Sequence, residues 1–572
     1  MAVKFSQMAD VYQKLECITS GNQIRALLSD FFKTVPLAEI DIVSYLTLGQ
    51  IASKYEDINL GMAEKMVLKA VANATEQPAN RVNKLFRKLG DAGIVAEQLV
   101  GKRQRELSAR EVFDTLHSIA RTAGAGSQER KISYLSRLFT AASPLEARYL
   151  ARIVIGQLRL GAGEKAILDS LALAYTGSKT AKTMLEHAYN VCPDIGIIAK
   201  TLVNKGLKGV SKINVQVFRP VQMMLAQRVD KISEIHRKMP GLMSAEEKYD
   251  GERIQAHAKG NTIILYSRRL DNITSQFPDV VAALRASIKA KDYIIEGEVV
   301  AVDKKGNLLP FQTLMARRRK YDVEAYARKV PVHLYVFDAL LVNGRNYLRT
   351  AYPERRRTLE RITKEGMIVK LARRKLCEKI DDVETFFNQV IQRGCEGIIA
   401  KSCAPGAYYT PGTRGWLWIK WKREYQKELA DTFDLVVVGA FAGKGRRSGT
   451  YGALLCAAYN PETDTFETFC KLGTGFNDKE LAQLPRKFPA IKQQPKNVSV
   501  SRLLKPDYWV APATVIEVLG AEITKSPLHT AAGGLALRFP RFVRYRPDKR
   551  PEQATTTKEV IKMAVRVYTE LR

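Results

Sequence analysis

One short segment of the chain places a lysine where it could act as a nucleophile. The segment reads Glu246-Glu247-Lys248-Tyr249-Asp250-Gly251-Glu252-Arg253. A free lysine amine titrates near pH ~10.4, so it attacks phosphorus only where desolvation or nearby cations favour loss of its proton. Arg253 could supply such a cation, because Asp250-Gly251 favours a tight turn back toward Lys248. The segment therefore indicates a candidate nucleophile, with a solvated β-hairpin as the structural alternative.

The elements that must position this lysine lie in a β-rich middle region of the chain. Alternating or apolar runs predict strands at Arg253–Ala258, Thr262–Ser267, Tyr293–Val302, Val332–Leu341, Gly397–Lys401 and Trp416–Trp421. Helical spacing appears between them at Val280–Ala290 and Val383–Gln392. This texture predicts an α+β domain over residues 216–428.

The region before it, residues 1–215, has apolar residues at helical spacing and predicts an all-helical domain. Helices are expected to begin at Ser127 and to run through Tyr149–Leu158, and the Phe31-Phe32 pair is expected in a helix core. Between two helices comes a loop whose small residues and cations could hold phosphates through backbone amides, with a simple helix–helix turn as the alternative. Its candidate DNA-binding residues are Arg159, Gly161, Gly163 and Lys165.

The last region, residues 429–572, carries shorter strand signals that suit a small β-barrel of the oligonucleotide-binding (OB) type. The strands are expected at Leu435–Phe441, Gly452–Tyr459, Phe466–Leu472 and Thr514–Val518, with a closing helix near Lys558–Thr569. The predicted fold class is therefore multidomain, α and α+β.

Amino-acid composition limits the kinds of binding partner and the cellular location that the protein can have. The chain has 572 residues with 91 Lys and Arg against 59 Asp and Glu, a net charge of +32 that favours a polyanionic partner such as nucleic acid. No apolar run approaches the ~18–20 residues of a membrane span, and no signal peptide is evident. The seven cysteines form no Cys-x-x-Cys pair, so neither a zinc ribbon nor a disulfide framework is indicated. We expect a cytoplasmic, nucleoid-associated protein and a monomer.

Polar residues stand at the ends of several predicted strands. Glu298 lies inside the apolar run Ile294–Val302, where an unpaired carboxylate would be costly. Any one such charge could be a structural salt bridge. Together the segments Ser267–Arg269, Glu296–Glu298, Tyr335–Asp338, Glu396–Lys401 and Trp418–Lys422 offer two carboxylates for a divalent cation, further cations and an aromatic face. This is the inventory that nucleotidyl transfer needs.

In this order the segments resemble the motifs of ATP-dependent DNA ligases, members of the covalent nucleotidyltransferase superfamily. The segment Leu537–Lys549, followed by Pro551–Thr557, is similar to the last motif of the archaeal and eukaryotic replicative ligases. The helical region, including Leu158–Leu171, resembles their DNA-binding domain. Pro547 departs from the pattern, since many relatives carry an acidic residue there, and we expect it to alter only the local backbone.

The resemblance implies a role for each matching residue. Lys248 would become covalently adenylated, Glu246 would hydrogen-bond the adenine amino group, and Phe337 would stack on the adenine ring. Arg253 and Arg268 would contact the AMP or the DNA 5′-phosphate, and the other members of the ATP-binding set are Glu298, Arg414, Lys401, Lys420 and Lys422, whose lysines would hold the α-phosphate. Glu298 and Glu396 would serve the ribose and the metal, Mg²⁺ or Mn²⁺. The pyrophosphate would be oriented from the barrel by Arg544, Arg546, Asp548 and Lys549.

The implied reaction is the sealing of nicked duplex DNA with ATP, joining a 5′-phosphate to a 3′-hydroxyl in replication, repair and recombination. The positive charge suits three domains that contact the duplex backbone without reading bases. The barrel is expected to swing between a pose for adenylation and a pose that faces DNA. The lack of a long N-terminal extension favours a prokaryotic, archaeal-type enzyme.

Several alternatives are left open. An RNA ligase or an mRNA-capping guanylyltransferase would share the Lys-x-Asp-Gly core but not the long helical region, and an NAD-dependent ligase would need a zinc-binding cysteine set. A non-catalytic DNA-binding scaffold is the alternative of a different class. A sliding clamp stays undecided as a partner, because Lys102–Leu107 lacks a paired aromatic. The run Arg317–Lys320 is expected to contact phosphates, and the scattered histidines are expected to be structural.

Overall fold

The computed structural model describes residues 2–102, 105–229, 231–317, 323–422, 432–443, 449–520 and 522–569. The chain divides into two units, one made of Met1–Glu76 with Ala96–Gln426 and the other of Gln77–Val95 with Lys427–Arg572. Among the helices that are described, none is both long and apolar enough to cross a bilayer.

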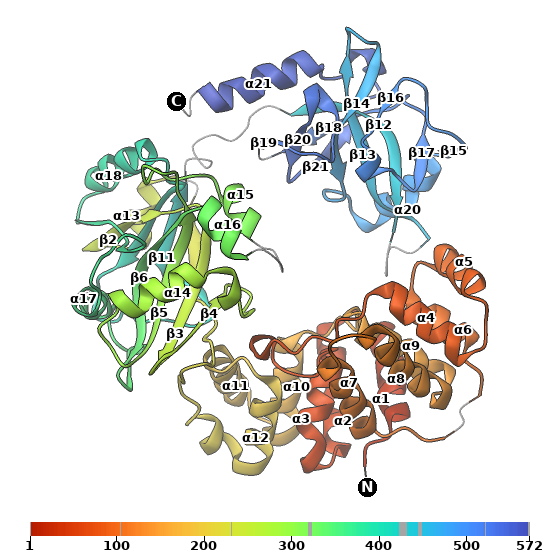
Figure 1. Ribbon diagram of the computed structural model, residues 1–572, viewed down its shortest axis with the longest axis horizontal. Helices are drawn as coiled ribbons and strands as arrows, with labels where there is room; N and C mark the ends of the chain where they lie inside the picture. The colour runs from red at the N-terminus through yellow and green to blue at the C-terminus, as the bar shows by residue number, and fades with distance from the viewer. Residues whose placement is uncertain are drawn as a thin grey trace. The chain divides into compact units, whose positions relative to one another are not determined.

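Helices occupy the first region of the chain, as the apolar spacing predicts (Figure 1). They are α1 (Phe5–Glu16), α2 (Gly21–Thr34), α3 (Ile40–Thr47), α4 (Glu64–Ala74), α5 (Ala79–Leu89), α6 (Ala92–Leu99), α7 (Ala109–Arg121), α8 (Ser127–Ala141), α9 (Pro144–Val154), α10 (Glu164–Thr176), α11 (Lys179–Val191) and α12 (Ile195–Val210). Phe31 and Phe32 are buried on α2, which confirms the core interpretation of that pair.

The helix predicted over Tyr149–Leu158 is α9, which ends earlier, at Val154. Local sequence explains where it begins and where it ends. α9 starts with a capping box in which Ser143 Oγ accepts the Glu146 N–H and Glu146 accepts the Ser143 N–H. Two residues after its last helical residue, Gly156 has a φ of 67°. Glycine takes this left-handed conformation without steric cost, so the chain leaves the helix there.

Two sheets follow in the first unit. Within the described residues one has the strand order β1-β11-β10-β2-β9, and the other has β4-β3-β5-β6-β7 with β8 beside β6. The strands are β1 (Leu225–Arg228), β2 (Met243–Lys248), β3 (Glu252–Lys259), β4 (Thr262–Ser267), β5 (Asp292–Ala301), β6 (Val332–Val342), β7 (Arg345–Asn346), β8 (Val369–Leu371), β9 (Arg374–Cys377), β10 (Gly397–Ser402) and β11 (Arg414–Lys422). All six strands expected in this region are therefore present.

Helices cover the outer faces of the two sheets. The outer layers include α13 (Ser233–Lys238), α14 (Pro278–Ser287), α17 (Tyr352–Ile362) and α18 (Ile380–Gln392), and the short α15 (Phe311–Leu314) and α16 (Val323–Lys329) complete the set. α14 and α17 pack apolar residues on the β3–β5–β6 sheet, and α13 and α18 do so on the β2–β10–β11 sheet. Alternate residues of a strand point to opposite faces, so the inner faces carry the remaining residues, which include polar side chains and a second apolar cluster around Ile294, Leu340 and Trp418.

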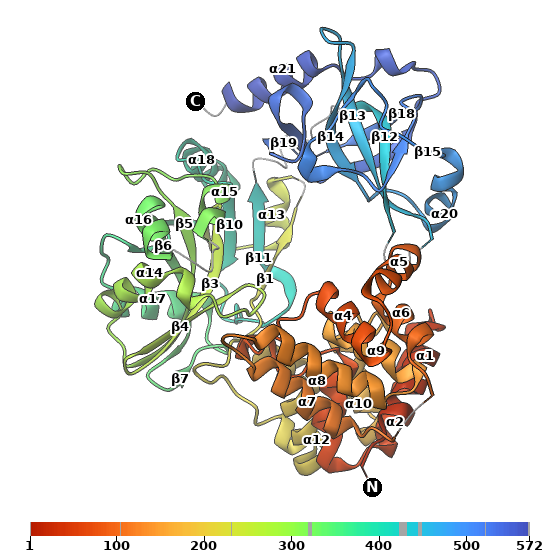
Figure 2. The ribbon, with the colours of Figure 1, turned by 45° about the vertical axis from the view of Figure 1, so that its right-hand side comes forward.

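The second unit is built on a sheet whose described strands pair antiparallel, except that β14 and β16 are parallel. Its described strands pair in the order β15-β17-β12-β13-β14-β16, and β18 joins β12 to β21. Figure 2 shows β12, β13 and β14 side by side. The bounds are β12 (Phe433–Ala442), β13 (Tyr451–Asn460), β14 (Thr465–Leu472), β15 (Ala490–Ile491), β16 (Val498–Ser499), β17 (Tyr508–Val510), β18 (Val515–Leu519), β19 (Glu522–Lys525), β20 (Leu535–Arg538) and β21 (Arg541–Tyr545), with α20 (Asp478–Lys487) and α21 (Thr557–Thr569). The expected multidomain class with a C-terminal barrel-type sheet is confirmed.

Candidate active site

Lys248 is the last residue of β2, and the neighbouring strands place further charges beside it. In the sheet register Lys248 pairs with Gly397 of β10, and Gly397 pairs with Lys422 of β11. Glu396 directly precedes β10, and its N–H donates to the Lys248 carbonyl oxygen at 2.9 Å. The Glu396 carboxylate forms an ion pair with Lys248 and, through the same Oε2 atom, contacts Lys422 Nζ at 3.0 Å. One carboxylate oxygen therefore bridges two lysines.

A glycine makes this bridge possible. Gly397 has a φ of 152°, in the half of backbone space that favours glycine. A Cβ added there would lie 2.1 Å from the Trp421 carbonyl oxygen and 2.8 Å from the Lys422 Cα. Any other residue would push β10 away from β11, so the approach of Glu396 to Lys422 depends on this position.

The Asp250-Gly251 turn connects the two sheets. β2 and β3 belong to different sheets, so the solvated-hairpin interpretation is wrong. A Cβ on Gly251 would lie 2.3 Å from the Val299 carbonyl oxygen, which requires glycine at this crossing. Asp250 accepts the Phe311 N–H at 3.0 Å, and burial raises the pKa of Asp250. The turn thus places the lysine between the inner faces of both sheets.

Arg253 contacts a different carboxylate from the one that Lys248 contacts. Its guanidinium donates to Glu296 at 2.8 Å and lies 5.4 Å from the ring centroids of both Phe337 and Trp418. Glu396, the partner of Lys248, is instead contacted by Lys422. Arg253 still contributes to the electrostatics of the site, because its charge opposes the rise in the pKa of Glu298.

Three more of the predicted cations lie within electrostatic range of the bridge. Burial lowers the pKa of Lys420, and the charges of Lys422, Lys248, Arg414 and Arg268 lower it further. Lys420 and Lys422 are two residues apart on β11 and share a strand face. Such a gathering of like charges repels itself, so a bound anion would relieve it.

Among the residues that the structure describes, the carboxylate of Glu298 has no direct partner. Burial raises the pKa of Glu298 to about 7, opposed by Lys248 and Arg253 and assisted by Glu396 and Asp250. Within the described residues, no hydrogen bond or ion pair reaches it. Carboxylate oxygens of this kind suit a hard divalent cation. Among the described residues, no group of three or more His, Cys, Asp or Glu side chains is placed to hold a metal ion.

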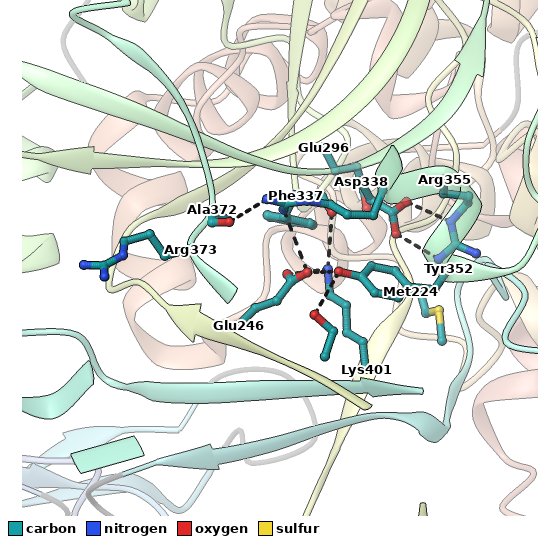
Figure 3. Close-up of polar contacts among 12 residues, drawn as sticks. Met224, Glu246, Glu296, Phe337, Asp338, Tyr352, Arg355, Ala372, Arg373 and Lys401 are labelled. Atoms are coloured by element: carbon teal, nitrogen blue, oxygen red, sulfur yellow. Dashed lines mark hydrogen bonds and ion pairs between the residues drawn. The ribbon is translucent and has the colours of Figure 1, made fainter. Parts of the chain in front are cut away.

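A buried cluster surrounds Glu246, which lies two residues before Lys248 on the same face of β2. Figure 3 shows Glu246, Lys401 and Tyr352 pointing toward one another. The carboxylate contacts Lys401 Nζ at 2.7 Å, accepts a hydrogen bond from the Tyr352 hydroxyl and lies 3.9 Å from the Arg356 guanidinium. Burial, followed by the negative charge of Glu246, raises the pKa of Tyr352, so the hydroxyl keeps its proton and donates.

The structure places Lys401 beside Glu246. The side chain is 1% exposed, and its Nζ lies 4.4 Å, 4.6 Å and 5.0 Å from the ring centroids of Trp418, Phe337 and Tyr352. In the register Lys401 pairs with Ser244 and Trp418, well along the strands from the Lys248 bridge. The lysine is therefore held by Glu246 and three rings, and its contact with the α-phosphate stays a prediction.

Phe337 owes its orientation to a β-bulge. Glu296 pairs with Asp338, but the next residue of β5, Gly297, pairs with Val336, so Phe337 is the extra residue of β6. Bulges of this kind redirect a side chain. The Phe337 ring meets Trp418 at a centroid distance of 6.3 Å and an interplanar angle of 78°, between the two sheets.

Arg355 on α17 anchors the strand that carries Phe337, and the sequence interpretation missed it. Arg355 and Asp338 are both 0% exposed and form a two-point ion pair at 2.8 Å and 3.0 Å (Figure 3). The available signal was Pro353 followed closely by three arginines, since proline is favoured in the first turn of a helix. That signal gave no indication that two of the arginines would be buried.

In the second unit, Asp434 of β12 gathers two of the cations predicted to orient pyrophosphate. It contacts Arg546 at 2.9 Å and 3.0 Å and Lys549 at 2.6 Å. Arg546 also contacts Asp548 at 2.7 Å and lowers the pKa of Asp548 to about 2. The Lys549 N–H donates to the Arg546 carbonyl oxygen at 3.2 Å, which places Pro547 at the second position of a turn, where its fixed φ fits.

Arg544 lies on β21 beside this cluster. It donates to Glu517 of the neighbouring strand β18 at 2.5 Å. Hydrogen bonds from Thr432 and Arg544 lower the pKa of Glu517. The four predicted residues of the last motif thus lie close together on one side of the barrel.

The loop predicted to contact DNA connects α9 to α10. Arg159 and Gly161 have positive φ values of 56° and 71°, and Gly163 is the N-cap of α10 without a side-chain cap. A Cβ on Gly163 would meet nothing within 4 Å, so this helix start is open. Lys165 pairs with Glu186 at 3.0 Å.

Two further predictions are only partly covered by the described residues. Arg317 is 1% exposed and forms a two-point ion pair with Asp279, so it is a buried structural residue and does not belong to a phosphate-contacting face. Arg318, Arg319 and Lys320 lie outside the described residues, as do Arg103 and Gln104 of the candidate clamp segment.

Three family models match successive regions of the chain. The family model described as DNA ligase N terminus matches residues 4–172. The model described as ATP dependent DNA ligase domain matches residues 223–422, and the ATP dependent DNA ligase C terminal region matches residues 447–549.

Full-length relatives are similar over nearly all of both chains. DNA ligase 2 of Thermofilum pendens is 46% identical over 98% of this chain and 97% of its own. DNA ligase 1 of Methanosarcina acetivorans is 43% identical over 98% of this chain and 99% of its own. The solved structure called Pmar-Lig_Pre. has a similar fold, with a TM-score of 0.57 and 16% identity over 94% of this chain and 99% of that chain.

Proposed function

Because the chain belongs to the family of ATP-dependent DNA ligases, we propose that Lys248 is the nucleophile that carries AMP during the sealing of nicks. The observation that carries this assignment is the Glu396 carboxylate bridging Lys248 and Lys422 among three further cations. An anionic triphosphate is the ligand that such a gathering of positive charge attracts.

In the first step the Lys248 amine attacks the α-phosphorus of ATP. A P–N bond forms, the bond to the bridging oxygen breaks, and pyrophosphate leaves. Charge builds on the non-bridging oxygens, where Lys420, Lys422 and Arg268 would stabilise it. Glu246 and Phe337 would hold the base. The ATP-binding set is completed by Arg253, Arg414, Glu298 and Lys401.

Attack requires Lys248 to leave Glu396 and to lose a proton. Lys422 touches the same oxygen at 3.0 Å, so Glu396 keeps a cationic partner when Lys248 turns to the phosphorus. This shared contact lowers the cost of breaking the Lys248 ion pair, because an unpaired and partly buried carboxylate would be expensive. Lys422 is thus both the substitute partner and a neighbouring positive charge.

In the second step an oxygen of the DNA 5′-phosphate attacks the phosphorus of the lysyl-adenylate, and the P–N bond breaks to free Lys248. In the third step the 3′-hydroxyl attacks the activated 5′-phosphate, and AMP leaves. Both steps are in-line displacements at phosphorus, so the same cations serve all three.

Glu298 and Glu396 would hold the divalent cation, Mg²⁺ or Mn²⁺. A metal bound there would supply positive charge to the phosphate oxygens. The unpaired state of Glu298 among the described residues supports this assignment.

The three expected domains would divide the work at residues 215 and 428. The helical domain, residues 1–215, would hold duplex DNA, with Arg159, Gly161, Gly163 and Lys165 at the phosphate backbone. Residues 216–428 would perform adenylation, and Arg544, Arg546, Asp548 and Lys549 would orient the pyrophosphate from the domain of residues 429–572. The matched family regions 4–172, 223–422 and 447–549 support this division.

The setting follows from the substrate. A net charge of +32 supports backbone contacts around a nick, and the prokaryotic relatives support a cytoplasmic, nucleoid-associated enzyme. We propose that it acts as a monomer, and a sliding clamp stays an undecided partner.

The experiment incubates the protein with labelled ATP and Mg²⁺ and then adds nicked duplex DNA. We expect the protein to gain the label and to lose it to the nick with formation of sealed product. Lys248→Ala should abolish labelling but keep duplex binding, and Lys259→Ala, at an exposed end of β3, should label normally. Labelling of Lys248→Ala, or stable labelling by GTP in place of ATP, would contradict the assignment.

A further inference from the structure

We propose that Tyr352 is a positioning residue for base selection, whose hydroxyl holds the Glu246 carboxylate in place to accept the amino group of adenine. The proposal rests on the proposed function, because it concerns the base of the nucleotide that reaches Lys248. It assigns to α17, which the sequence interpretation did not connect to the site, a role in choosing ATP.

The contacts around Glu246 carry the argument. Tyr352 donates to Oε1 and Lys401 contacts Oε2 at 2.7 Å, so each carboxylate oxygen has a close buried partner, and the Arg356 guanidinium lies 3.9 Å from Oε1. Tyr352 and Lys401 are 0% and 1% exposed, so water cannot replace either contact. The carboxylate is therefore fixed in one orientation by two buried donors.

The location of Tyr352 is fixed by neighbours that also shape the base pocket. Its ring is one of three that surround Lys401, together with Phe337 and Trp418. Its helix is anchored by Arg355, which pairs with Asp338 beside Phe337. Residues of one helix, α17, therefore hold both Glu246 and the strand that carries Phe337.

The chemistry of purines makes the orientation of this carboxylate selective. Adenine presents an N–H donor at position 6, which a carboxylate oxygen accepts. Guanine and hypoxanthine present a carbonyl oxygen there, which a carboxylate repels, and unsubstituted purine presents neither. A carboxylate free to rotate would lose some of this discrimination, because buried polar groups select most strongly when their geometry is fixed.

The test compares adenylation by ATP and by purine riboside triphosphate, which lacks only the 6-amino group. We expect Tyr352→Phe to lower the ATP-to-purine ratio of kcat/KM roughly tenfold, as expected for loss of a hydrogen bond to a charged group. In a Glu246→Gln background the same change should not alter the ratio further. Equal losses with both nucleotides, or an unchanged ratio, would overturn the proposal.

Tyr293→Phe is the matched control, because this buried hydroxyl has no hydrogen-bond partner among the described residues. It should leave the ratio unchanged. If Tyr352→Phe does not fold, Lys401→Gln removes the other contact of Glu246, and it should lower the ratio in the same direction. Failure of the proposed function would look different, since neither nucleotide would then label Lys248 in the unmodified protein.

Discussion

Replacing Gly397 with alanine should separate the two strands that carry the lysine bridge. The new Cβ would lie 2.1 Å from the Trp421 carbonyl oxygen, so β10 or β11 must move by about 1 Å or more to reach ordinary contact. The movement would draw Glu396 away from Lys422. A displacement of this size costs about 100-fold in rate at an active site, and the overpacking and backbone strain together cost about 2–5 kcal/mol of stability.

The assay measures the rate at which labelled AMP becomes attached to the protein, alongside thermal unfolding. Gly394→Ala is the matched control, because Gly394 also has a positive φ, 85°, but an added Cβ meets nothing within 4 Å. It should cost about 1 kcal/mol of stability and leave adenylation near the rate of the unmodified protein. Equal adenylation rates for the two variants would refute the reasoning.

Three further predictions concern other regions of the molecule. Asp434→Asn should remove the carboxylate that Arg546 and Lys549 share and slow adenylation about tenfold, while sealing of a nick that already carries a 5′-adenylate stays unchanged; equal loss in both assays would count against the pyrophosphate role. Burial lowers the pKa of His257 from 6.5 to about 3. The contribution of neutral His257 to stability is therefore full above pH 6.5 and is lost as pH falls toward 3. The unfolding free energy should fall between pH 7.5 and pH 5 by about 2 kcal/mol more than in His257→Gln, measured with denaturant. Burial raises the pKa of Glu298 to about 7, so its contribution to stability is present below pH 4.5 and is lost as pH rises through 7. Ionised Glu298 is the metal-binding form, so the Mg²⁺ concentration for half-maximal adenylation should fall from pH 6 to pH 8, and Glu298→Gln should remove that dependence.

Much of the fold could be predicted from local pattern. The apolar spacing around Phe31-Phe32 predicted a helix core, and alternation predicted the strands that became β3 to β6. Strand pairing was not predictable in the same way, because the Asp250-Gly251 turn suits a hairpin as well as a crossing between sheets. The helix α17 was missed because its buried face carries Arg355 and Arg356 in place of apolar residues.

Candidate site residues could be proposed from the sequence, but their partners in the structure could not. Glu396 is 148 positions from Lys248, and only the β2–β10 register brings them together. Lys401 shows the limit most clearly. The sequence places it among the other lysines of the site, but only the register shows that it lies beside Glu246 and Trp418. Arg253 likewise binds Glu296, a carboxylate whose partner could not be inferred from spacing.

The central claim is that AMP becomes attached to the Nζ atom of Lys248. Peptide mass spectrometry after incubation with ATP and Mg²⁺, under conditions that preserve an acid-labile P–N bond, tests it most directly. The account predicts one AMP on the peptide that contains Lys248, and its loss after nicked DNA is added. AMP on a different residue, or an unmodified Lys248 in protein that seals nicks, would contradict it.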